Sequence, residues 1–162
     1  MNEKKSEKIK KIYFRLRENS RIDEMDNYIH HGNCSTLKHS FGVAYFSMNI
    51  GEKLGMKPDY EILIKSAIIH DYYLYDWHDK ESWHSLHGFK HPKFALKNAL
   101  EDFNLNEKEI DAITNHMFPL VPFLPKYKEG RILCFADKLC AAYEIFKKNP
   151  YEELYKYIKG EL

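Results

Sequence analysis

Apolar residues recur at helical spacing in one segment of the chain after another, and this periodicity constrains the fold more than any other feature. Residues three or four positions apart share one face of an α-helix, whereas a half-buried strand alternates apolar and polar residues. The sequence contains no convincing two-residue alternation and no hairpin signal. We therefore predict an all-α fold, a bundle of about seven or eight helices.

Capping and helix-breaking residues mark where these helices begin and end. Ser35 is suited to cap a central helix, and Pro58 opens the next one. Pro92 suits the first turn of a later helix, and residues 75–91 before it show no clear period and are interpreted as a long loop. The expected helices cover residues 7–17, 21–31, 36–54, 58–70, 92–103, 106–117, 131–147 and a short segment from Pro150.

Length and charge exclude several classes of protein. The chain has 162 residues, which predicts one domain with a core of its own. Lys and Arg number 25 against 24 Asp and Glu, so the formal charge is nearly balanced. Because a protein that binds duplex nucleic acid through its phosphates needs a basic excess, we expect no such partner.

Cysteine content and hydropathy bear on the compartment. The three cysteines form no CxxC pair, which argues against a disulfide framework and against a thiolate zinc site. No signal peptide is visible, and no apolar run approaches the roughly 18 residues that a membrane helix needs. We expect a cytoplasmic, reduced protein with no membrane partner.

Histidine is the residue type that most suggests chemistry, because nine are present and imidazole is the commonest metal ligand. Six His and Asp residues fall on or beside the predicted helices, namely His39, His70, Asp71, His91, His116 and Asp137. Asp71 and Asp137 lie at or within apolar segments, and burying an ionised carboxylate without a partner is very costly. Each carboxylate therefore needs a cation, a metal ion or hydrogen-bond donors.

Each of these residues also has an ordinary structural interpretation. A single inward histidine is more often a hydrogen-bonded core residue than a ligand. Asp71 is able to cap a following turn, and Asp137 is able to pair with Lys138 or Arg131. The order of the six residues across four helices favours one site over these separate explanations.

The order of the six residues, with its adjacent His-Asp pair, resembles the motif of the HD superfamily of metal-dependent phosphohydrolases, an all-α fold. The resemblance covers about residues 35–147. Members with two metals add a histidine that begins one helix and a histidine that ends the next, which His91 and His116 match. The resemblance implies a single HD domain over residues 1–162, with N-terminal helices in residues 4–31 packed on its core. The subgroup that it resembles most contains small bacterial hydrolases of nucleotides and dinucleoside polyphosphates.

The resemblance implies a centre with two divalent transition-metal ions, for which iron, manganese, zinc, nickel and cobalt are all suited to imidazole and carboxylate ligands. The implied ligands are His39, His70, Asp71 and Asp137 for one ion, and Asp71, His91 and His116 for the other. His70 and Asp71 are the implied catalytic residues. The implied reaction is hydrolysis of a phosphate ester or anhydride of a small molecule, above all a nucleotide, by a metal-activated hydroxide.

One position departs from the family pattern. Many relatives carry Lys or Glu four residues after the histidine of the pair, whereas this chain has Leu74. The role of that residue is either unfilled or has moved, with Asp76, His78, Lys90 and Lys138 as alternatives.

Substrate contacts are predicted mainly around the long loop. The residues assigned to substrate binding are His87, Lys90, Lys138, Trp77 and Tyr72. The aromatic residues of 72–84 either anchor the loop or stack against a nucleobase. His84 shares with His87 the alternative of contacting phosphate, and His30 and His31 are interpreted as surface residues.

Other functions stay open at this point. A nucleotide-binding or signal-sensing module that keeps the metals but has weak or no turnover is the main alternative, favoured by Leu74. A bundle with purely structural histidines is another, and an oxidative iron chemistry known among relatives is the least favoured. The oligomeric state is open as well, with a homodimer as one alternative.

Overall fold

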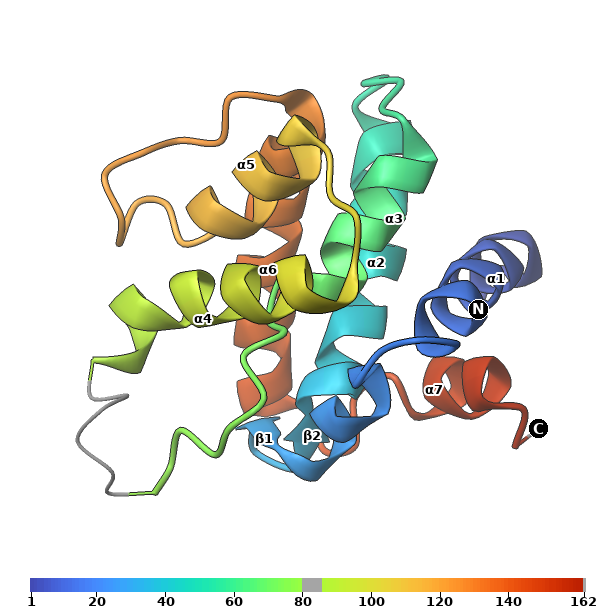
Figure 1. Ribbon diagram of the computed structural model, residues 1–162. Helices are drawn as coiled ribbons and strands as arrows, with labels where there is room; N and C mark the ends of the chain where they lie inside the picture. The colour runs from blue at the N-terminus through green and yellow to red at the C-terminus, as the bar shows by residue number, and fades with distance from the viewer. Residues whose placement is uncertain (80–85, 162) are drawn as a thin grey trace.

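The computed structural model describes residues 1–79 and 86–161, and over these residues the prediction of an all-α fold is confirmed (Figure 1). None of the described helices is long and apolar enough to pass through a membrane. The elements, in chain order, are α1 (Glu3–Arg17), the 3-10 helix η1 (Ile22–Asn27), β1 (Ile29–His31), β2 (Cys34–Ser35), α2 (Thr36–Lys53), α3 (Tyr60–Ile69), α4 (His87–Asp102), α5 (Glu107–Asn115), α6 (Lys128–Phe146) and α7 (Glu152–Lys159).

Three helices form the centre of the bundle, because α2 packs against both α3 and α6. Figure 1 shows α1 and α7 together on one side of this centre, and α4 with α5 on the other. The core is filled by buried apolar side chains such as Phe41, Leu63, Ile68 and Leu133. The residues of the His and Asp motif therefore lie on helices whose positions are set by the core.

Side-chain caps explain where several helices start. Ser35 accepts a hydrogen bond from the Lys38 N–H at 3.2 Å, which confirms the predicted start of α2. Asp59 accepts from two N–H groups in the first turn of α3, at 3.0 and 3.3 Å. In α5, Asn106 and Glu109 form a capping box that satisfies N–H groups in both directions.

A glycine sets the close approach of α5 and α6. A Cβ atom added at Gly130 meets the Cβ of Pro125 at 2.8 Å and the backbone Cα of Ala112 at 3.3 Å. A side chain there displaces Pro125, in the stretch between the two helices, and requires α5 to move by a few tenths of an ångström. Gly130 therefore fixes the distance between the helix that ends near His116 and the helix that carries Asp137.

The prediction of a helix over residues 21–31 is wrong in its second half. The chain forms the 3-10 helix over Ile22–Asn27, then turns through Gly32 at φ +58° into a two-stranded antiparallel hairpin. His31 pairs with Cys34 across this hairpin. Ile22 and Met25 lie three residues apart on the 3-10 helix, and both are buried. The same three-residue spacing suggested a longer helix in the sequence.

The expected start of α4 at Pro92 is also wrong, because the helix begins at His87. The carbonyl oxygen of Leu86 accepts hydrogen bonds from the N–H groups of Phe89 and Lys90 at 2.9 and 3.2 Å, which closes a turn ahead of the proline. As a result the rings of His87 and His91 stack one turn apart, with centroids 4.6 Å from one another. The loop predicted over residues 75–91 is correspondingly shorter.

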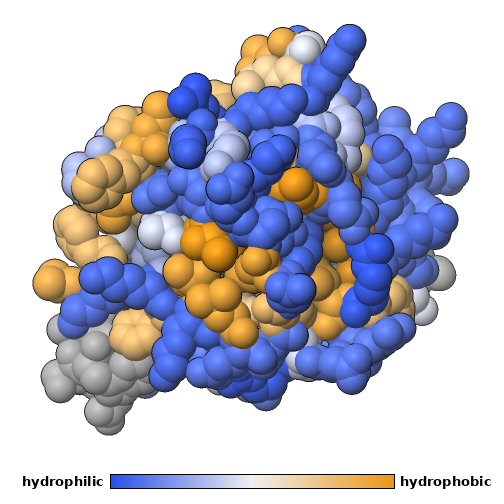
Figure 2. Space-filling model, turned by 45° about the horizontal axis from the view of Figure 1, so that its top comes forward, coloured by the Kyte–Doolittle hydropathy of each residue, from blue (hydrophilic) through white to orange (hydrophobic). Residues whose placement is uncertain are grey.

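Apolar side chains are exposed along the stretch between α5 and α6. Leu120, Phe123 and Leu124 are all exposed there. Figure 2 shows apolar surface at the left, the side on which Figure 1 places this stretch. The same stretch borders the cavity described next.

Candidate metal centre

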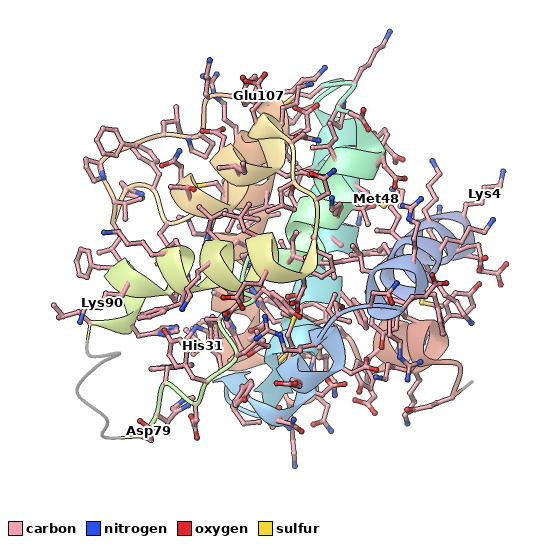
Figure 3. All side chains as sticks on the ribbon, in the orientation of Figure 1. Lys4, His31, Met48, Asp79, Lys90 and Glu107 are labelled. Atoms are coloured by element: carbon pink, nitrogen blue, oxygen red, sulfur yellow. The ribbon has the colours of Figure 1, made fainter. Side chains whose placement is uncertain are left out.

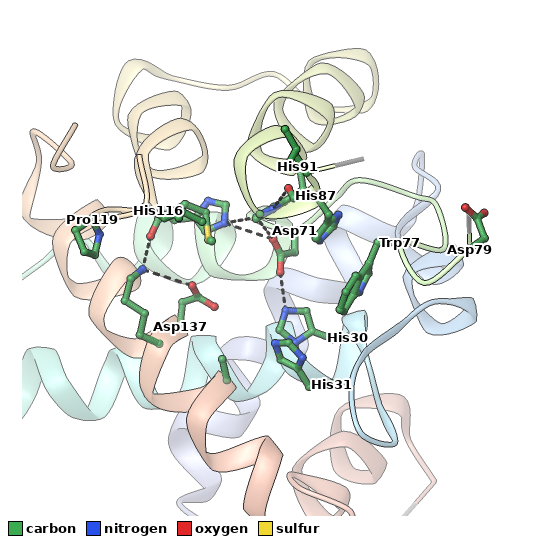
Figure 4. A pocket seen from close by; sticks show the side chains of 16 residues that line it. His30, His31, Asp71, Trp77, Asp79, His87, His91, His116, Pro119 and Asp137 are labelled. Atoms are coloured by element: carbon green, nitrogen blue, oxygen red, sulfur yellow. Dashed lines mark hydrogen bonds and ion pairs between the residues drawn. The ribbon is translucent and has the colours of Figure 1, made fainter. Parts of the chain in front are cut away.

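A cavity of about 1010 Å³ opens between β1, the segment after α3, α4, the stretch after α5 and α6 (Figure 4). Its polar floor includes Asp71, His91, His116 and Asp137. Its rim is largely apolar, formed by residues such as Trp77, Leu86, Met117, Pro119 and Leu120. The cavity therefore joins a polar floor to a pocket that suits the apolar part of a small molecule.

The three central helices bring four of the six predicted ligands together. His39 Nε2 from α2 lies 3.2 Å from Asp137 Oδ1 on α6. His70, which follows α3, places its Nε2 atom 3.6 Å from the same oxygen and 3.4 Å from Asp71 Oδ2. All four side chains are buried. We call His39, His70 and Asp137 the first set.

The remaining two ligands come from the periphery of the bundle. His91 on α4 and His116 after α5 face one another, with their Nε2 atoms 2.8 Å apart. These atoms lie 3.2 Å and 3.5 Å from Asp71 Oδ1. We call His91 and His116 the second set, and Asp71 stands between the two sets.

Hydrogen bonds at Nδ1 orient the histidines toward the centre. The Nδ1 atoms of His70, His91 and His116 each donate to a backbone carbonyl oxygen, of Ala67, His87 and Ile113, at 2.7 to 3.0 Å. His39 Nδ1 donates instead to the carboxylate of Glu144 at 2.7 Å. Because the proton is on Nδ1, the Nε2 atom of each ring presents its lone pair to the centre, as metal-ligating histidines do.

The donor atoms fit a cation. Two neutral imidazole nitrogens at 2.8 Å repel one another unless a positive charge lies close by, and this is the distance between His91 and His116. Within residues 1–79 and 86–161, the buried atoms His70 Nε2 and Asp71 Oδ1 have no hydrogen-bond partner. His30, His39 and Asp71 form one group of mutually close ligand atoms, His39, His70 and Asp137 form a second, and His70, Asp71 and His116 form a third. The second and third groups consist of predicted ligands and are placed to hold divalent metal ions.

Residues 36–142 match the family described as HD domain, which is two thirds of the chain. The chain belongs to the HD domain family. HD domains are generally metal-dependent phosphohydrolases named after a His-Asp pair, which is His70-Asp71 here. No curated protein and no solved structure matches the chain.

The histidines of this HD domain keep its two central carboxyl groups ionised. Burial raises the pKa of Asp71, but the neighbouring His70 and His91 outweigh that and hold it well below the ordinary value. Burial acts in the same way on Asp137, whose pKa is held well below the ordinary value by the neighbouring His39 and His70. Ionised carboxylates are the form that binds a metal ion.

Sequence reasoning missed two residues that lie against this centre, both outside the segment that matches the HD family. The prediction that His30 is a surface residue is wrong, because the side chain is buried with Nε2 3.2 Å from Asp71 Oδ2. Glu144 was not singled out, although it follows Asp137 by two helical turns and shares its face of α6. Burial raises the pKa of Glu144, but His39 and His30 lower it to about 2.

Three of the predicted substrate residues line the cavity of the HD domain. The Trp77 ring stacks on His87, with centroids 5.0 Å apart, and His87 in turn stacks on His91. The Lys138 ammonium donates to the carbonyl oxygens of His116 and Cys134 at 2.7 and 3.2 Å, at the edge of the polar floor. These side chains are therefore within reach of a molecule in the cavity.

Two other predicted substrate residues lie elsewhere. Tyr72 is fully buried, and its hydroxyl donates to Asp102 on α4 at 2.5 Å, so the side chain belongs to the core of the HD domain. Lys90 lies at the outer end of α4 (Figure 3) and is not among the described residues that line the cavity. Leu74 has a φ of +54° and packs against the core. His84 and Trp83 lie outside the described residues.

Proposed function

We propose that this HD domain is a phosphohydrolase with two divalent metal ions, of which the first set holds one and the second set the other. The observation that carries the proposal is the placement of Asp71 between the sets. Its Oδ2 lies 3.4 Å from His70 Nε2, and its Oδ1 lies 3.2 Å from His91 Nε2. A carboxylate that faces one ligand set with one oxygen and the other set with its second oxygen is suited to bridge two ions.

The ligand chemistry supports a transition metal and leaves several candidates. Imidazole and carboxylate without thiolate suit iron, manganese, zinc, nickel and cobalt. Bound as a pair, such ions lower the pKa of water and polarise a phosphoryl oxygen. The residues of the chain supply the rest: they orient the phosphate group, hold its other substituent and keep the ligands in place.

The cavity supports a small phosphorylated substrate. Lys138 places a positive charge at the edge of the polar floor, where it is suited to contact a phosphate oxygen and takes over the role that Leu74 cannot fill. The apolar rim around Trp77 and Leu120 is suited to an aromatic or apolar substituent. A nucleotide has both parts, so we propose a nucleotide as substrate, cleaved at a phosphate ester or anhydride.

A phosphate-release assay with metal analysis tests this function. The purified protein is expected to carry a transition metal and to release phosphate from members of a nucleotide panel when Mn²⁺ or Fe²⁺ is added. Asp71→Ala is expected to abolish both. A protein without bound metal contradicts the proposal outright. Stoichiometric metal without phosphate release from any panel member favours the alternative of a nucleotide-binding or sensing module.

A further inference from the structure

A buried carboxylate beside the centre belongs to no part of the His and Asp motif. The Glu144 side chain has no exposed surface, and its two oxygens have different partners. Oε1 accepts from His39 Nδ1 at 2.7 Å, and Oε2 accepts from His30 Nδ1 at 3.1 Å. Because a buried ionised carboxylate is costly without partners, Glu144 depends on both histidines and restrains both in return.

His30 is not placed to share a metal ion with His39. The two rings stack with centroids 3.6 Å apart and planes inclined by 20°. An ion bound by an imidazole nitrogen lies close to the plane of the ring. Two nearly parallel planes at stacking distance do not meet near the Nε2 atoms, so one ion cannot lie in both. The ring of His30 therefore has a different role from the ring of His39.

The other nitrogen of His30 faces the carboxylate that stands between the two ligand sets. His30 Nε2 lies 3.2 Å from Asp71 Oδ2, on the side of Asp71 that faces the first set (Figure 4). His30 reaches this place because the β1–β2 hairpin carries it over the N-terminal end of α2. The chain of contacts thus runs from Glu144 through His30 to Asp71, and from the same Glu144 to His39.

We propose that Glu144 and His30 are positioning residues of the metal centre: the Glu144 carboxylate orients His39 directly and orients Asp71 through His30. The proposal rests on the proposed metal centre, since it concerns how two of its ligands are held. Groups that hydrogen-bond to metal ligands set the direction of the donor atoms, and their loss typically lowers metal affinity about 10- to 100-fold. Both residues act without touching the ion.

The Glu144→Gln variant tests the shared carboxylate. A glutamine amide has one oxygen to accept and an NH₂ group that cannot, so one of the two histidine N–H groups loses its acceptor. We expect the affinity for Co²⁺, measured by competition with a chelating dye, to fall about 10- to 100-fold. The matched control is Glu129→Gln on the same helix, where an equally buried glutamate accepts only from the Asp59 N–H at 2.8 Å. The control is expected to keep the wild-type affinity for Co²⁺.

The His30→Ala variant separates the second link from the first. It removes the contact with Asp71 and leaves the hydrogen bond between Glu144 and His39 in place. We expect a lower Co²⁺ affinity and a shifted visible absorption spectrum of the bound Co²⁺, because the orientation of the shared carboxylate changes. The control is His31→Ala, which removes an imidazole that lines the cavity and packs edge-on against His30, with centroids 4.4 Å apart. It leaves the contacts of His30 with Glu144 and Asp71 in place, so both readouts are expected to stay as in the wild type.

Measurements of Co²⁺ binding by the wild type and by the variants distinguish failure of this proposal from failure of the proposed function. A folded Glu144→Gln protein whose Co²⁺ affinity is within about twofold of the wild-type value overturns the proposed role of Glu144. Loss of a hydrogen bond that orients a ligand should lower the affinity by more than that. If Glu144→Gln does not fold, His30→Ala decides, and unchanged affinity and spectrum overturn the proposal. A wild-type protein that binds no Co²⁺ contradicts the metal centre itself. Wild-type binding with weakened variants supports both.

Discussion

The two ligand sets of the centre are held in different ways. In the first set, His39 on α2 is bound by the side chain of Glu144 on α6, so a hydrogen bond crosses from one central helix to another. In the second set, the Nδ1 atoms of His91 and His116 donate to backbone carbonyl oxygens within the same turn of chain, those of His87 and Ile113. The Nδ1 hydrogen bond of His39 therefore ties two helices together, whereas the Nδ1 hydrogen bonds of the second set stay within the turn that carries each histidine.

This difference has a consequence for metal binding. The first set sits where α2 packs against α3 and α6, at the centre of the core. The 2.8 Å separation of His91 Nε2 and His116 Nε2 depends on how α4 packs on α5 at the periphery. We therefore expect the first ion to bind tightly and the second to exchange more easily, because local opening is more frequent where packing is less extensive.

The largest effect is expected from Asp71, the residue that both sets share. Asp71→Asn removes one negative charge from between the two ions, so both sites weaken together. Because a metal pair supplies several kcal/mol of transition-state stabilisation, phosphate release should fall by on the order of 10³-fold or more. Elemental analysis of the purified variant and a phosphate-release assay measure the two losses.

The control for this prediction is Asp59→Asn. Asp59 caps α3 at the far end from His70, and asparagine caps a helix as well as aspartate does. Metal content and activity should therefore stay at the wild-type level. An Asp71→Asn protein that keeps one tightly bound ion would show that the carboxylate is not shared, and the two sets would then be independent sites.

A pair of histidine variants tests the asymmetry between the sets. His39→Ala removes a ligand of the first set and leaves Glu144 buried with one partner fewer, so the variant should lose both ions. His91→Ala removes a ligand of the second set and should lose only the exchangeable ion. The ratio of metal to protein after dialysis, measured by elemental analysis, distinguishes the two. Equal losses from both variants contradict the difference between the sets.

The sequence alone indicates which helices carry the predicted ligands of the first set, but it says little about the surroundings of the centre. Ser35 and Asp59 cap α2 and α3 through local contacts, so the helices that carry His39 and His70 are visible in the sequence. The resemblance to the HD family supplied the grouping of ligands from separate helices. Periodicity by itself indicates only that each histidine falls on or near a helix.

Contacts between distant segments account for what could not be predicted. His30 is buried by a hairpin whose strands have three and two residues, which is too short to show an alternation pattern in the sequence. Its hydrogen-bond partner, Glu144, lies 114 positions away along the chain. Tyr72 follows the His-Asp pair directly and was expected near the substrate. The chain turns immediately after Asp71, and the Tyr72 hydroxyl reaches Asp102 in the core instead. Adjacency in sequence therefore does not indicate the direction of a side chain outside regular structure.

A smaller effect is expected where α5 meets α6. Gly130→Ala places a methyl group 2.8 Å from Pro125 Cβ and 3.3 Å from the Ala112 backbone, so the stretch around Pro125 must shift and α5 must move away from α6 by a few tenths of an ångström. Overpacking of this kind typically costs about 1–3 kcal/mol of unfolding free energy. Because α5 leads into His116, the affinity for the second ion should fall more than the affinity for the first. Denaturant unfolding and two-site metal titration measure both effects.

The control for the glycine prediction lies on α2. The three atoms nearest to a Cβ added at Gly51 are side-chain atoms of Pro58 and Ile132, at 3.3 to 3.7 Å. Gly51→Ala should therefore change stability less and leave both metal affinities as they are. Weakening of the first ion in Gly130→Ala, with the second unaffected, contradicts the view that α5 governs only the second set.

The smallest effect concerns the anchoring of α4, the helix that carries His91. Asp102 near its C-terminal end accepts from the Arg21 side chain at 3.0 Å and from the Tyr72 hydroxyl at 2.5 Å. Burial raises the pKa of Asp102, but these hydrogen bonds outweigh it and lower the pKa below the ordinary value. Asp102→Asn should lower the unfolding free energy by about 1 kcal/mol at pH 7, since a partly exposed charged pair contributes little more.

The pH dependence of that difference shows where it comes from. A carboxyl group whose pKa is lowered on folding stabilises the protein above its unfolded pKa of about 3.9, and this stabilisation is lost as the pH falls through the folded value. The difference in unfolding free energy between wild type and Asp102→Asn should therefore be constant near neutral pH and should disappear in acid. Glu101→Gln is the matched control, because Glu101 pairs with the same Arg21 at 2.9 Å but is about half exposed. The difference in unfolding free energy between wild type and Glu101→Gln should be smaller than that for Asp102→Asn at every pH. A difference for Asp102→Asn that persists in acid means that shape rather than charge anchors α4, and the second ligand set then depends on packing alone.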